Sequence, residues 1–439
     1  MFRSLSTVGP LLISVGLMQT ANGLFGSLLG VRLGQAENIS PEISGLVLSG
    51  YFMGMTVGCL VCGSLIERVG HVRTFAVLVS IVSAVSVAHA YLVEPFYWWV
   101  LRVIYGFCMA GAYMVVESWL NGSVDNRSRG SLLSIYMIIV FGAMAGSQYL
   151  LNLSSAKTFV LYGLTSIVFS LSLVPLSLQR PSSGGPTDIT SSALSFRELY
   201  RISPFGMVAS FGSGILMGAV LAGGSIYASA RGFTVSEIAQ FISVSIFGGL
   251  LLQYPLGKLS DLMDRRTIMT AAVLSGAISA LVLAVLPMPF WIFLIIAGFF
   301  GGIASTLYSI AVAYTNDYLD AADLVPASAG LLLAFGIGAA AGPISATQAM
   351  GIVGPSGFYL FLALVSLGIG IFGIWRMIRR AAIPMEDQGP FVFVSRASPV
   401  GAELDPRGGV DTEDGSDLAG TPGDEESGDL PEKPSNAIS

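Results

Sequence analysis

The sequence predicts an all-α integral membrane protein with twelve transmembrane helices in two pseudo-symmetric six-helix bundles. Its 439 residues are 53% hydrophobic and only 11% charged, whereas a soluble globular protein carries roughly 25% charged residues. Apolar runs of about 20 residues, the length needed to cross about 30 Å of hydrocarbon as a helix, recur along the chain. A charged hairpin occurs at Gly63 and again at Gly257, and this repeat divides the chain into two related halves.

Twelve apolar runs are long enough to cross a membrane. The first contains several glycines, is longer than the apolar core of a signal peptide and lacks a convincing cleavage site, so we expect it to be retained as a helix. The expected spans are residues 8–32, 43–66, 72–92, 97–119, 130–152, 157–178, 204–227, 235–256, 267–286, 289–315, 324–348 and 356–378.

The repeated hairpin links two apolar runs in each half. Each copy begins with a glycine, has an acid four residues later and continues with bases. The first copy contains Gly63, Glu67, Arg68, Gly70 and Arg73, and the second contains Gly257, Asp261, Arg265 and Arg266. A second spacing also repeats, since Glu117 precedes Gly130 by 13 residues and Asp317 precedes Gly330 by 13. We therefore predict an N-terminal bundle at residues 1–178, a cytoplasmic linker at 179–203 and a C-terminal bundle at 204–380.

Lysine and arginine are concentrated in alternate loops, which is the pattern of membrane proteins whose basic loops face the cytoplasm. Groups of bases occupy residues 68–73, 127–129, 180–201, 258–266 and 376–380. The intervening loops contain only Arg32, Lys157 and Arg231, all near membrane edges. We therefore expect a multi-pass protein of the bacterial inner membrane with both termini in the cytoplasm.

The C-terminal region, residues 381–439, has a different composition. It holds 13 acids and three bases and is rich in Gly, Pro, Ser and Asp, a composition that favours a disordered acidic tail. A solvated tail without a specific task and a tail that binds a partner both fit this composition.

These features resemble the major facilitator superfamily of membrane transporters. The best-known sequence mark of that family is the hairpin G-x-L-x-D-R-x-G-R between the second and third helices. The hairpin at Gly63 follows it, with Glu67 at the usual Asp and His71 at a usual base. The second copy has Leu262 at the first Arg and Asp264 at the second Gly. The resemblance covers residues 8–380 and implies transport by alternating access, in which two halves rock around a central site.

Shorter segments refine the resemblance. Residues 102–106 resemble the family's R-x-x-Q-G motif, with Tyr105 at the usual Gln. Segments 115–118, 126–130 and 136–137 resemble the bacterial YcaD-like branch of the family. The fifth span lacks the Gly-Pro pair of the family's drug/proton antiporters, which disfavours a standard drug exporter.

Polar side chains at membrane depth are the candidates for the substrate site. An ionised group in hydrocarbon is costly and normally faces a cavity or a partner. Arg102 either extends toward the membrane surface or lines a cavity, where it binds an anionic substrate or shifts a carboxylate pKa. The other candidates either contact substrate or hydrogen-bond to neighbouring helices. They are Gln19, Asn22, Gln148, Tyr308 and Tyr314.

The hairpin charges predict an ionic latch at the cytoplasmic ends of the helices. Exposed ion pairs contribute only about 0–1 kcal/mol each, yet a network of several shifts an equilibrium between two conformations. Charges that only set the topology would occupy the same positions. The expected gate consists of Gly63, Glu67, Arg68, Gly70, Arg73, Glu117, Arg129, Gly257, Asp261, Arg265, Arg266 and Asp317. We expect the stronger latch in the N-terminal half.

The sequence has no phosphate-binding P-loop and no cluster of catalytic or metal-ligating residues. We therefore expect a secondary transporter, not an enzyme, that moves a small-molecule substrate without a metal or bound cofactor. Coupling to the proton gradient is implied by the family resemblance. A gradient-independent facilitator and a transporter-like scaffold or sensor acting through the acidic tail are the alternatives. We expect a monomer in the lipid bilayer that does not bind nucleic acid.

Overall fold

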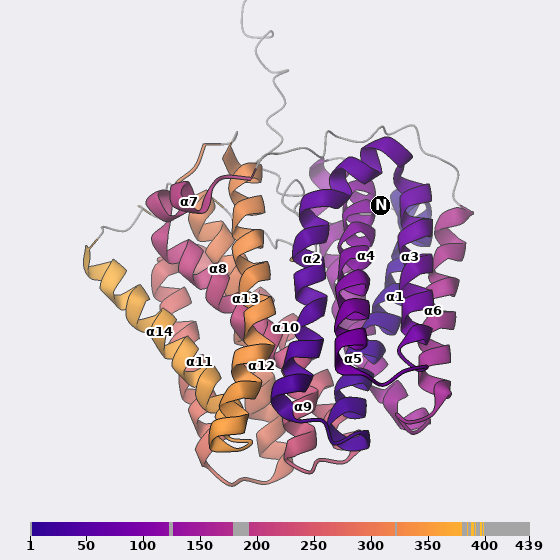
Figure 1. Ribbon diagram of the computed structural model, residues 1–439. Helices are drawn as coiled ribbons and strands as arrows, with labels where there is room; N and C mark the ends of the chain where they lie inside the picture. The colour runs from indigo at the N-terminus through magenta and orange to yellow at the C-terminus, as the bar shows by residue number, and fades with distance from the viewer. Residues whose placement is uncertain are drawn as a thin grey trace, which may run out of the picture.

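The computed structural model describes residues 2–122, 126–178, 193–320 and 323–379, together with Pro384, Gln388, Gly389, Phe391, Arg396 and Ser398. Side chains of residues 2–7 and 122–131 are not among the described parts. The described chain forms helices joined by short loops (Figure 1). Twelve of its spans are long and apolar enough to cross a membrane. The predicted helix number is therefore confirmed.

Each half contributes six of these spans, some of them built from more than one helical segment. The N-terminal half comprises α1 (Phe2–Val31), the π-helix η1 (Arg32–Ala36), α2 (Pro41–Val69), α3 (His71–Ala88), α4 (Pro95–Gly122), α5 (Asn126–Ser147), the 3-10 helix η2 (Gln148–Leu153) and α6 (Phe159–Ser177). The C-terminal half comprises α7 (Phe196–Ile202), α8 (Pro204–Gly218), the π-helix η3 (Ala219–Gly223), α9 (Gly224–Ala230), α10 (Val235–Leu262), α11 (Arg265–Val285), α12 (Phe290–Asn316), α13 (Leu324–Val353) and α14 (Gly357–Arg379).

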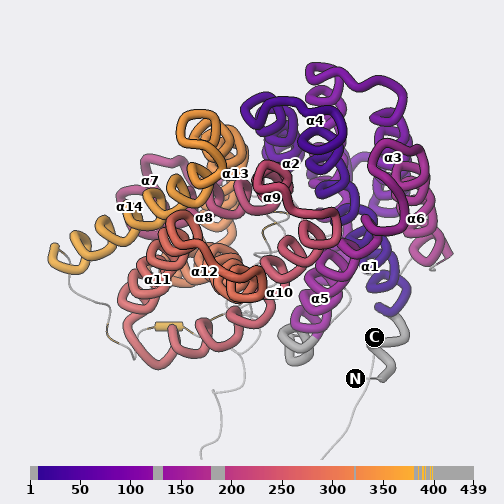
Figure 2. Tube along the Cα trace, turned by 90° about the horizontal axis from the view of Figure 1, so that it is seen from below, coloured from indigo at the N-terminus to yellow at the C-terminus, as the bar shows by residue number. Residues whose placement is uncertain are grey.

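The two halves repeat the same helix packing. Helix α2 packs on α4 as α10 packs on α12, and α3 packs on α6 as α11 packs on α14. Figure 2 shows the two bundles side by side. Glycines allow the close approaches, because a Cβ on Gly106 would collide with the carbonyl of Tyr51, and one on Gly248 would collide with that of Gly298. Small residues of this kind let membrane helices pack at short distance.

The two repeated hairpins turn in different ways. Gly70 alone separates α2 from α3 and has φ +89°, a conformation that favours glycine. In the second copy, Asp264 caps α11 by accepting a hydrogen bond from the Arg266 amide at 3.1 Å. A capping carboxylate also favours a helix N-terminus electrostatically. We call the membrane face that bears these two turns the hairpin side; it is the upper end in Figure 1.

The halves contact each other mainly through α2 with α13 and α5 with α10. On the face opposite the hairpin side, called the far side, Gln35 Nε2 donates to the Phe233 carbonyl at 2.6 Å. There Gly45 also lies against Thr347 and Gly351 against Glu42. On the far side the two halves are therefore in direct contact, and this end of the molecule is closed between them.

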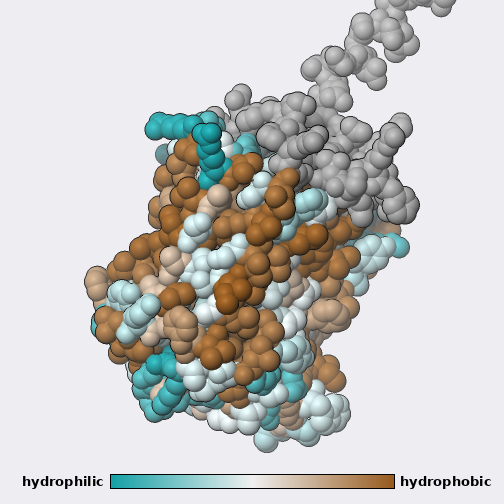
Figure 3. All heavy atoms as spheres, turned by 90° about the vertical axis from the view of Figure 1, so that its right-hand side faces the viewer, coloured by the Kyte–Doolittle hydropathy of each residue, from teal (hydrophilic) through white to brown (hydrophobic). Residues whose placement is uncertain are grey.

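The outer surface is apolar where the helices would meet lipid. Figure 3 shows hydrophobic side chains over the middle of one face and hydrophilic ones toward its upper and lower ends. Large apolar side chains such as Ile167 and Leu171 of α6 are exposed.

The short helix α7 lies apart from this belt and starts with a capping box, in which Ser195 and Glu198 satisfy each other's backbone amides. The pKa of the Glu198 carboxyl is lowered by these hydrogen bonds from Ser195. The described part of the expected linker thus contains a short capped helix, while residues 179–192 lie outside the described residues.

Candidate functional site

A central cavity lies between the halves and encloses about 1570 Å³ of empty space, part of it open to solvent. The N-terminal half supplies most of its polar lining, which includes Gln19, Asn22, Tyr51, Arg102, Tyr113 and Gln148. The C-terminal half supplies an apolar wall that includes Met217, Val220, Ile242, Ile246, Leu332 and Phe335. Apart from the hydroxyls of Ser245 and Ser305, the described lining from α8–α14 carries no polar side chain.

Arg102 lines this cavity and does not extend to the membrane surface. Its side chain is only 4% exposed. The guanidinium carbon lies 4.8 Å from the ring centre of Tyr51, 5.2 Å from that of Tyr105 and 5.9 Å from that of Phe25. Its Nε has no hydrogen-bond partner, and no ion pair of Arg102 occurs among the described residues. Aromatic rings stabilise such a cation by about 0.5–2 kcal/mol each.

A hydrogen-bonded cluster lies near Arg102 on the polar wall. The Tyr113 hydroxyl donates to Gln19 Oε1 at 2.5 Å and accepts from Asn22 Nδ2 at 3.3 Å. The Tyr105 hydroxyl donates to Asn22 Oδ1 at 3.1 Å. Tyr105, which stands where the family motif usually has Gln, therefore holds Asn22 and stacks near Arg102. The structure brings the candidates Gln19, Asn22 and Arg102 together.

Gln148 also lines the cavity, at the start of η2. Its Nε2 donates to the carbonyls of Gly23 and Met144, each at 3.0 Å, and its Oε1 accepts from Ser27 at 2.5 Å. The bonds to Gly23 and Ser27 join η2 to α1. Interhelical hydrogen bonding, one of its two expected roles, is therefore present.

Tyr308 and Tyr314 are not among the cavity-lining residues. Tyr308 is buried against Phe335, with ring centres 5.0 Å apart. Tyr314 packs on Phe205, and its hydroxyl accepts from Tyr318 at 3.2 Å. Both lie on α12, whose residues Gly301 and Ser305 do reach the cavity. These two tyrosines fill the interior of the C-terminal bundle in this conformation.

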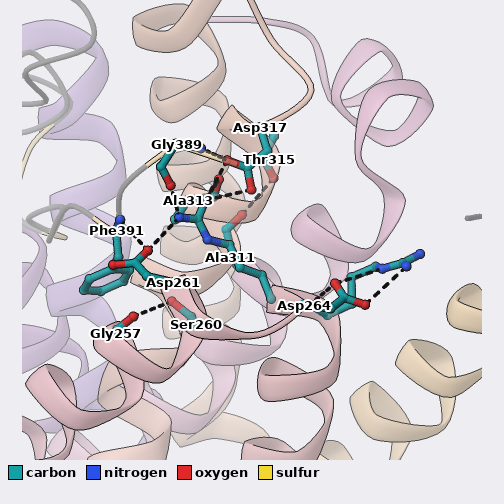
Figure 4. A network of polar contacts seen from close by, with 12 residues as sticks. Gly257, Ser260, Asp261, Asp264, Ala311, Ala313, Thr315, Asp317, Gly389 and Phe391 are labelled. Atoms are coloured by element: carbon teal, nitrogen blue, oxygen red, sulfur yellow. Dashed lines mark hydrogen bonds and ion pairs between the residues drawn. The ribbon is translucent and has the colours of Figure 1, made fainter. Parts of the chain in front are cut away.

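The hairpin of the C-terminal half carries a buried ion pair. Arg265 Nη1 lies 2.6 Å from Asp317 Oδ1, and both side chains are at most 2% exposed. Arg265 Nη2 pairs with Asp261 at 3.0 Å, and Nη1 also donates to the Ala313 carbonyl at 3.1 Å. Arg266 pairs instead with Asp264 at 3.3 Å. Figure 4 shows this network, which brings together the gate residues predicted for this half.

The hairpin of the N-terminal half is arranged differently. Glu67, Arg68 and Arg73 are exposed, and none of the three forms an ion pair with Glu117 in the described chain. Gly63 is half-buried beside them, whereas the Arg129 side chain lies outside the described residues. The expected pairing of Arg68 and Arg73 with Glu117 is therefore corrected for this conformation. Both arginines lie at exposed helix ends, whereas Glu117 lies inside the bundle.

Glu117 is fully buried near the hairpin-side end of α4. The Tyr136 hydroxyl donates to its Oε1 at 3.1 Å. The neighbouring Ser118 bonds to His71 Nε2 at 2.9 Å. The described ion pairs on the hairpin side thus lie in the C-terminal half. Because the Arg129 side chain lies outside the described residues, a stronger latch in the N-terminal half stays a prediction.

The C-terminal segment reaches the same network. By this name we mean its described residues Gln388, Gly389, Phe391, Arg396 and Ser398. The Gly389 carbonyl accepts from Arg265 and its amide donates to Asp317 at 3.3 Å (Figure 4). The Phe391 amide donates to Asp261 at 2.7 Å.

Further along, this segment enters the central cavity. Arg396 is one of the lining residues, with its guanidinium 5.8 Å from the ring centre of Phe141. Its Nη atoms lie 3.4 and 3.5 Å from Ser305 Oγ. The Ser398 hydroxyl donates to Glu117 at 2.5 Å. The acidic, polar composition of residues 381–439 gave no signal for these contacts, and residues 399–439 lie outside the described chain.

Comparisons with known proteins agree with this architecture. A profile of the Major Facilitator Superfamily matches residues 11–289 and 207–397. The chain is similar to the uncharacterized MFS-type transporter YcaD of Salmonella paratyphi A, with 29% identity over 370 residues that cover 83% of this chain and 94% of the relative. It is similar to YcaD of Salmonella typhi at 29% over 360 residues, which cover 81% and 92%.

Solved transporters share the fold at low identity. The nucleoside transporter NupG superposes with a TM-score of 0.69 and 14% identity, covering 83% of this chain and 98% of NupG. A bacterial homologue of the human lysosomal transporter Spinster, in an inward-facing and occupied conformation, gives 0.67 and 14%, covering 87% and 98%. With two bundles around a central cavity and a family profile along most of its length, this chain belongs to the Major Facilitator Superfamily of membrane transporters.

Proposed function

We propose that this transporter moves an amphipathic organic anion by alternating access about the central cavity. The observation that carries the proposal is Arg102, a buried guanidinium at membrane depth without an ion-pair partner in the described chain. An uncompensated buried charge is costly, and a bound anion removes that cost. Neighbouring hydrogen-bond groups on Gln19 and Asn22 would orient the head group of the solute.

The opposite wall supports an amphipathic solute over a small inorganic anion. Val220, Ile246 and Leu332 present apolar side chains across the cavity from Arg102. Burying apolar surface there contributes roughly 25 cal/mol per Å². A carboxylate or phosphate group near Arg102 with a hydrocarbon portion on this wall fits both surfaces.

The hairpin side is proposed to face the cytoplasm, with both termini on that side, in the bacterial inner membrane. The basic loops favour this orientation. Because the far side is packed shut at Gly45 and Thr347, the conformation described here would expose the cavity to the cytoplasm. Rocking of the two halves would open the far side and close the hairpin side. A monomer suffices for this motion.

A ligand screen on purified protein tests the anion site directly. A compound that binds the folded state raises its apparent melting temperature. Amphipathic carboxylates and phosphates should do so, whereas cationic and neutral isosteres should not. Arg102→Ala should weaken binding by about 10- to 100-fold, as expected for a lost hydrogen-bonded charge. Lys157→Ala, which removes an exposed cation of the same half, is the matched control. Full affinity in Arg102→Ala would refute the anion site.

Proton coupling is proposed to run through Glu117. This carboxyl is buried on α4, and each of its two oxygens is hydrogen-bonded to a hydroxyl, one of Tyr136 and one of Ser398. An ionised carboxylate accepts both bonds, whereas a protonated carboxyl also carries an O–H that must donate. A proton taken up there would weaken these bonds and alter the packing of α4. In proteoliposomes, an imposed pH gradient should change solute uptake by the unmodified protein and leave uptake by Glu117→Gln unchanged, while solute exchange persists in both. Uptake by the unmodified protein that ignores the gradient would instead indicate a facilitator.

A further inference from the structure

On the hairpin side, the hairpin of the C-terminal half binds the C-terminal segment through the backbone of that segment. Gly389 accepts from Arg265 and donates to Asp317, and the Phe391 amide donates to Asp261. The receptor side chains are held in place by the buried Arg265–Asp317 pair. Main-chain recognition of this kind is how proteins bind extended peptides.

A side-chain pocket adds to these backbone bonds. The Phe391 ring lies against Gly257, where a Cβ would collide with the ring. Gly257 is the first residue of the second hairpin copy, so the absence of a side chain makes room for Phe391. Figure 4 shows Phe391 and Gly389 above the hairpin that contains Gly257 and Asp261.

The segment also contacts the other half. Ser398 is 1% exposed and donates to Glu117 of α4, while Arg396 lies over Phe141 of α5. The described residues from Gly389 to Ser398 thus touch both bundles on the side where the halves must meet for the cavity to close. A peptide in this position and a closed hairpin side exclude each other, because interiors are densely packed and cannot accommodate both.

Arg396 brings a second cation into the cavity that contains Arg102. Burial lowers the pKa of Arg396 to about 10, so this side chain remains cationic at neutral pH. It occupies part of the volume available to a solute.

We infer that the hairpin of the C-terminal half, together with Glu117 and Phe141 of the N-terminal half, forms a binding site for the chain's own C-terminal segment. In its docked position this segment wedges the two halves apart and obstructs the cavity. The effect on solute flux rests on the proposed function, but docking and wedging do not. A tail that docks in cis pays little association entropy, so modest contacts suffice to keep it bound.

Trypsin cleavage of the full-length protein tests docking. Arg396 should be protected, whereas Arg407, further along the tail, serves as an internal control. Intact-mass measurements should show cleavage after Arg396 at least about tenfold slower than after Arg407, because docking must open before cleavage. In Ser398→Asp, which places a carboxylate beside Glu117, and in Phe391→Ala, the two rates should become similar. Ser416→Asp adds the same charge outside the docked residues and should retain protection.

Distance measurements between spin labels test the wedge. Labels at the exposed positions Ser64 of α2 and Leu262 of α10, with Cys59, Cys62 and Cys108 replaced, report the separation of the halves on the hairpin side. The otherwise unmodified protein should show one long distance, and Ser398→Asp should add a shorter population. Equal cleavage at Arg396 and Arg407 without any tail substitution would refute docking, and an unchanged distance distribution in Ser398→Asp would refute the wedge. Neither readout needs a substrate, so a failed ligand screen would leave both interpretable.

Discussion

The two halves share their helix packing but differ in chemistry. The N-terminal half places a cation, amides and phenols on its side of the cavity, while the C-terminal half places aliphatic and aromatic side chains opposite them. On the hairpin side, by contrast, it is the C-terminal half that carries the charged contacts among the described residues, because the buried Arg265–Asp317 pair lies there. A duplicated fold therefore does not imply duplicated sites. In the proposed function, one bundle holds the polar end of the solute and the other holds its apolar end, while the C-terminal segment contacts both bundles.

Equivalent positions in the hairpins make this difference concrete. His71 begins α3 and contacts Ser118, next to Glu117. Arg265 begins α11 and pairs with Asp317. A permanently charged guanidinium in the second copy demands a carboxylate, whereas an imidazole in the first requires only a hydroxyl. In the first copy Glu117 accepts hydrogen bonds from the Tyr136 and Ser398 hydroxyls.

Removing the acid of the buried pair should have the largest effect on stability. Asp317→Ala leaves Arg265 buried without its principal partner, and breaking such a pair costs about 3–5 kcal/mol. In the N-terminal half, Ser118→Ala removes the hydrogen bond to His71, the counterpart of Arg265, a loss of about 0.5–1.5 kcal/mol. Thermal unfolding of the purified protein should therefore show a clearly larger fall in melting temperature for Asp317→Ala.

The same comparison has two controls. Asp320→Ala removes a nearby but exposed carboxylate and should leave the melting temperature almost unchanged. The double substitution Arg265→Met with Asp317→Leu should recover most of the loss, because an apolar pair of similar volume is often as stable as a buried ion pair. Equal destabilisation by Asp317→Ala and Ser118→Ala would remove the distinction between the hairpins.

The apolar wall should control the dependence of affinity on chain length. If the C-terminal half binds the hydrocarbon part, each added methylene in a series of alkyl carboxylates should tighten binding by about fourfold, equivalent to about 0.8 kcal/mol. Leu332→Asn should flatten this dependence and leave the shortest members unaffected. Calorimetric titration of the series measures both slopes. Exposed Leu364→Asn of α14 is the matched control, and a slope unchanged in Leu332→Asn would contradict the assigned wall.

Sequence reasoning predicted the fold well because membrane spans have a strong compositional signature. Local rules predicted the twelve apolar runs and the two hairpins, and the structure confirms the twelve spans and places a tight turn at each hairpin. Arg102 was also recognisable as a cavity candidate, because an ionised side chain is costly in hydrocarbon and normally faces a cavity or a partner. The expected ion pairs of Asp261, Arg265 and Asp317 followed from the repeat.

Local sequence rules could not predict the contacts that depend on tertiary packing. Tyr308 and Tyr314 satisfy the same polarity criterion as Gln19, yet helix rotation turns them into the C-terminal bundle. Tyr113 was missed because an aromatic residue within an apolar run is usually a core residue. Its hydroxyl bonds to Gln19 and Asn22 of α1, and these contacts depend on how α1 and α4 pack. The position of Arg396 in the cavity depends on contacts with residues far away in the sequence, and the composition of the tail does not predict them.

The hydroxyl of Tyr113 offers the smallest and most discriminating test of the polar wall. It links Gln19 to Asn22, so Tyr113→Phe removes two hydrogen bonds while keeping the ring. One net hydrogen bond is worth about 1 kcal/mol, which predicts affinities about fivefold weaker for every member of the carboxylate series. Because the hydroxyl orients the head group, the chain-length slope should not change. Tyr149→Phe, at an exposed position, controls for the loss of a phenol. A changed slope with unchanged affinity for the shortest members would mean that the polar and apolar ends of the solute are not divided between the two halves.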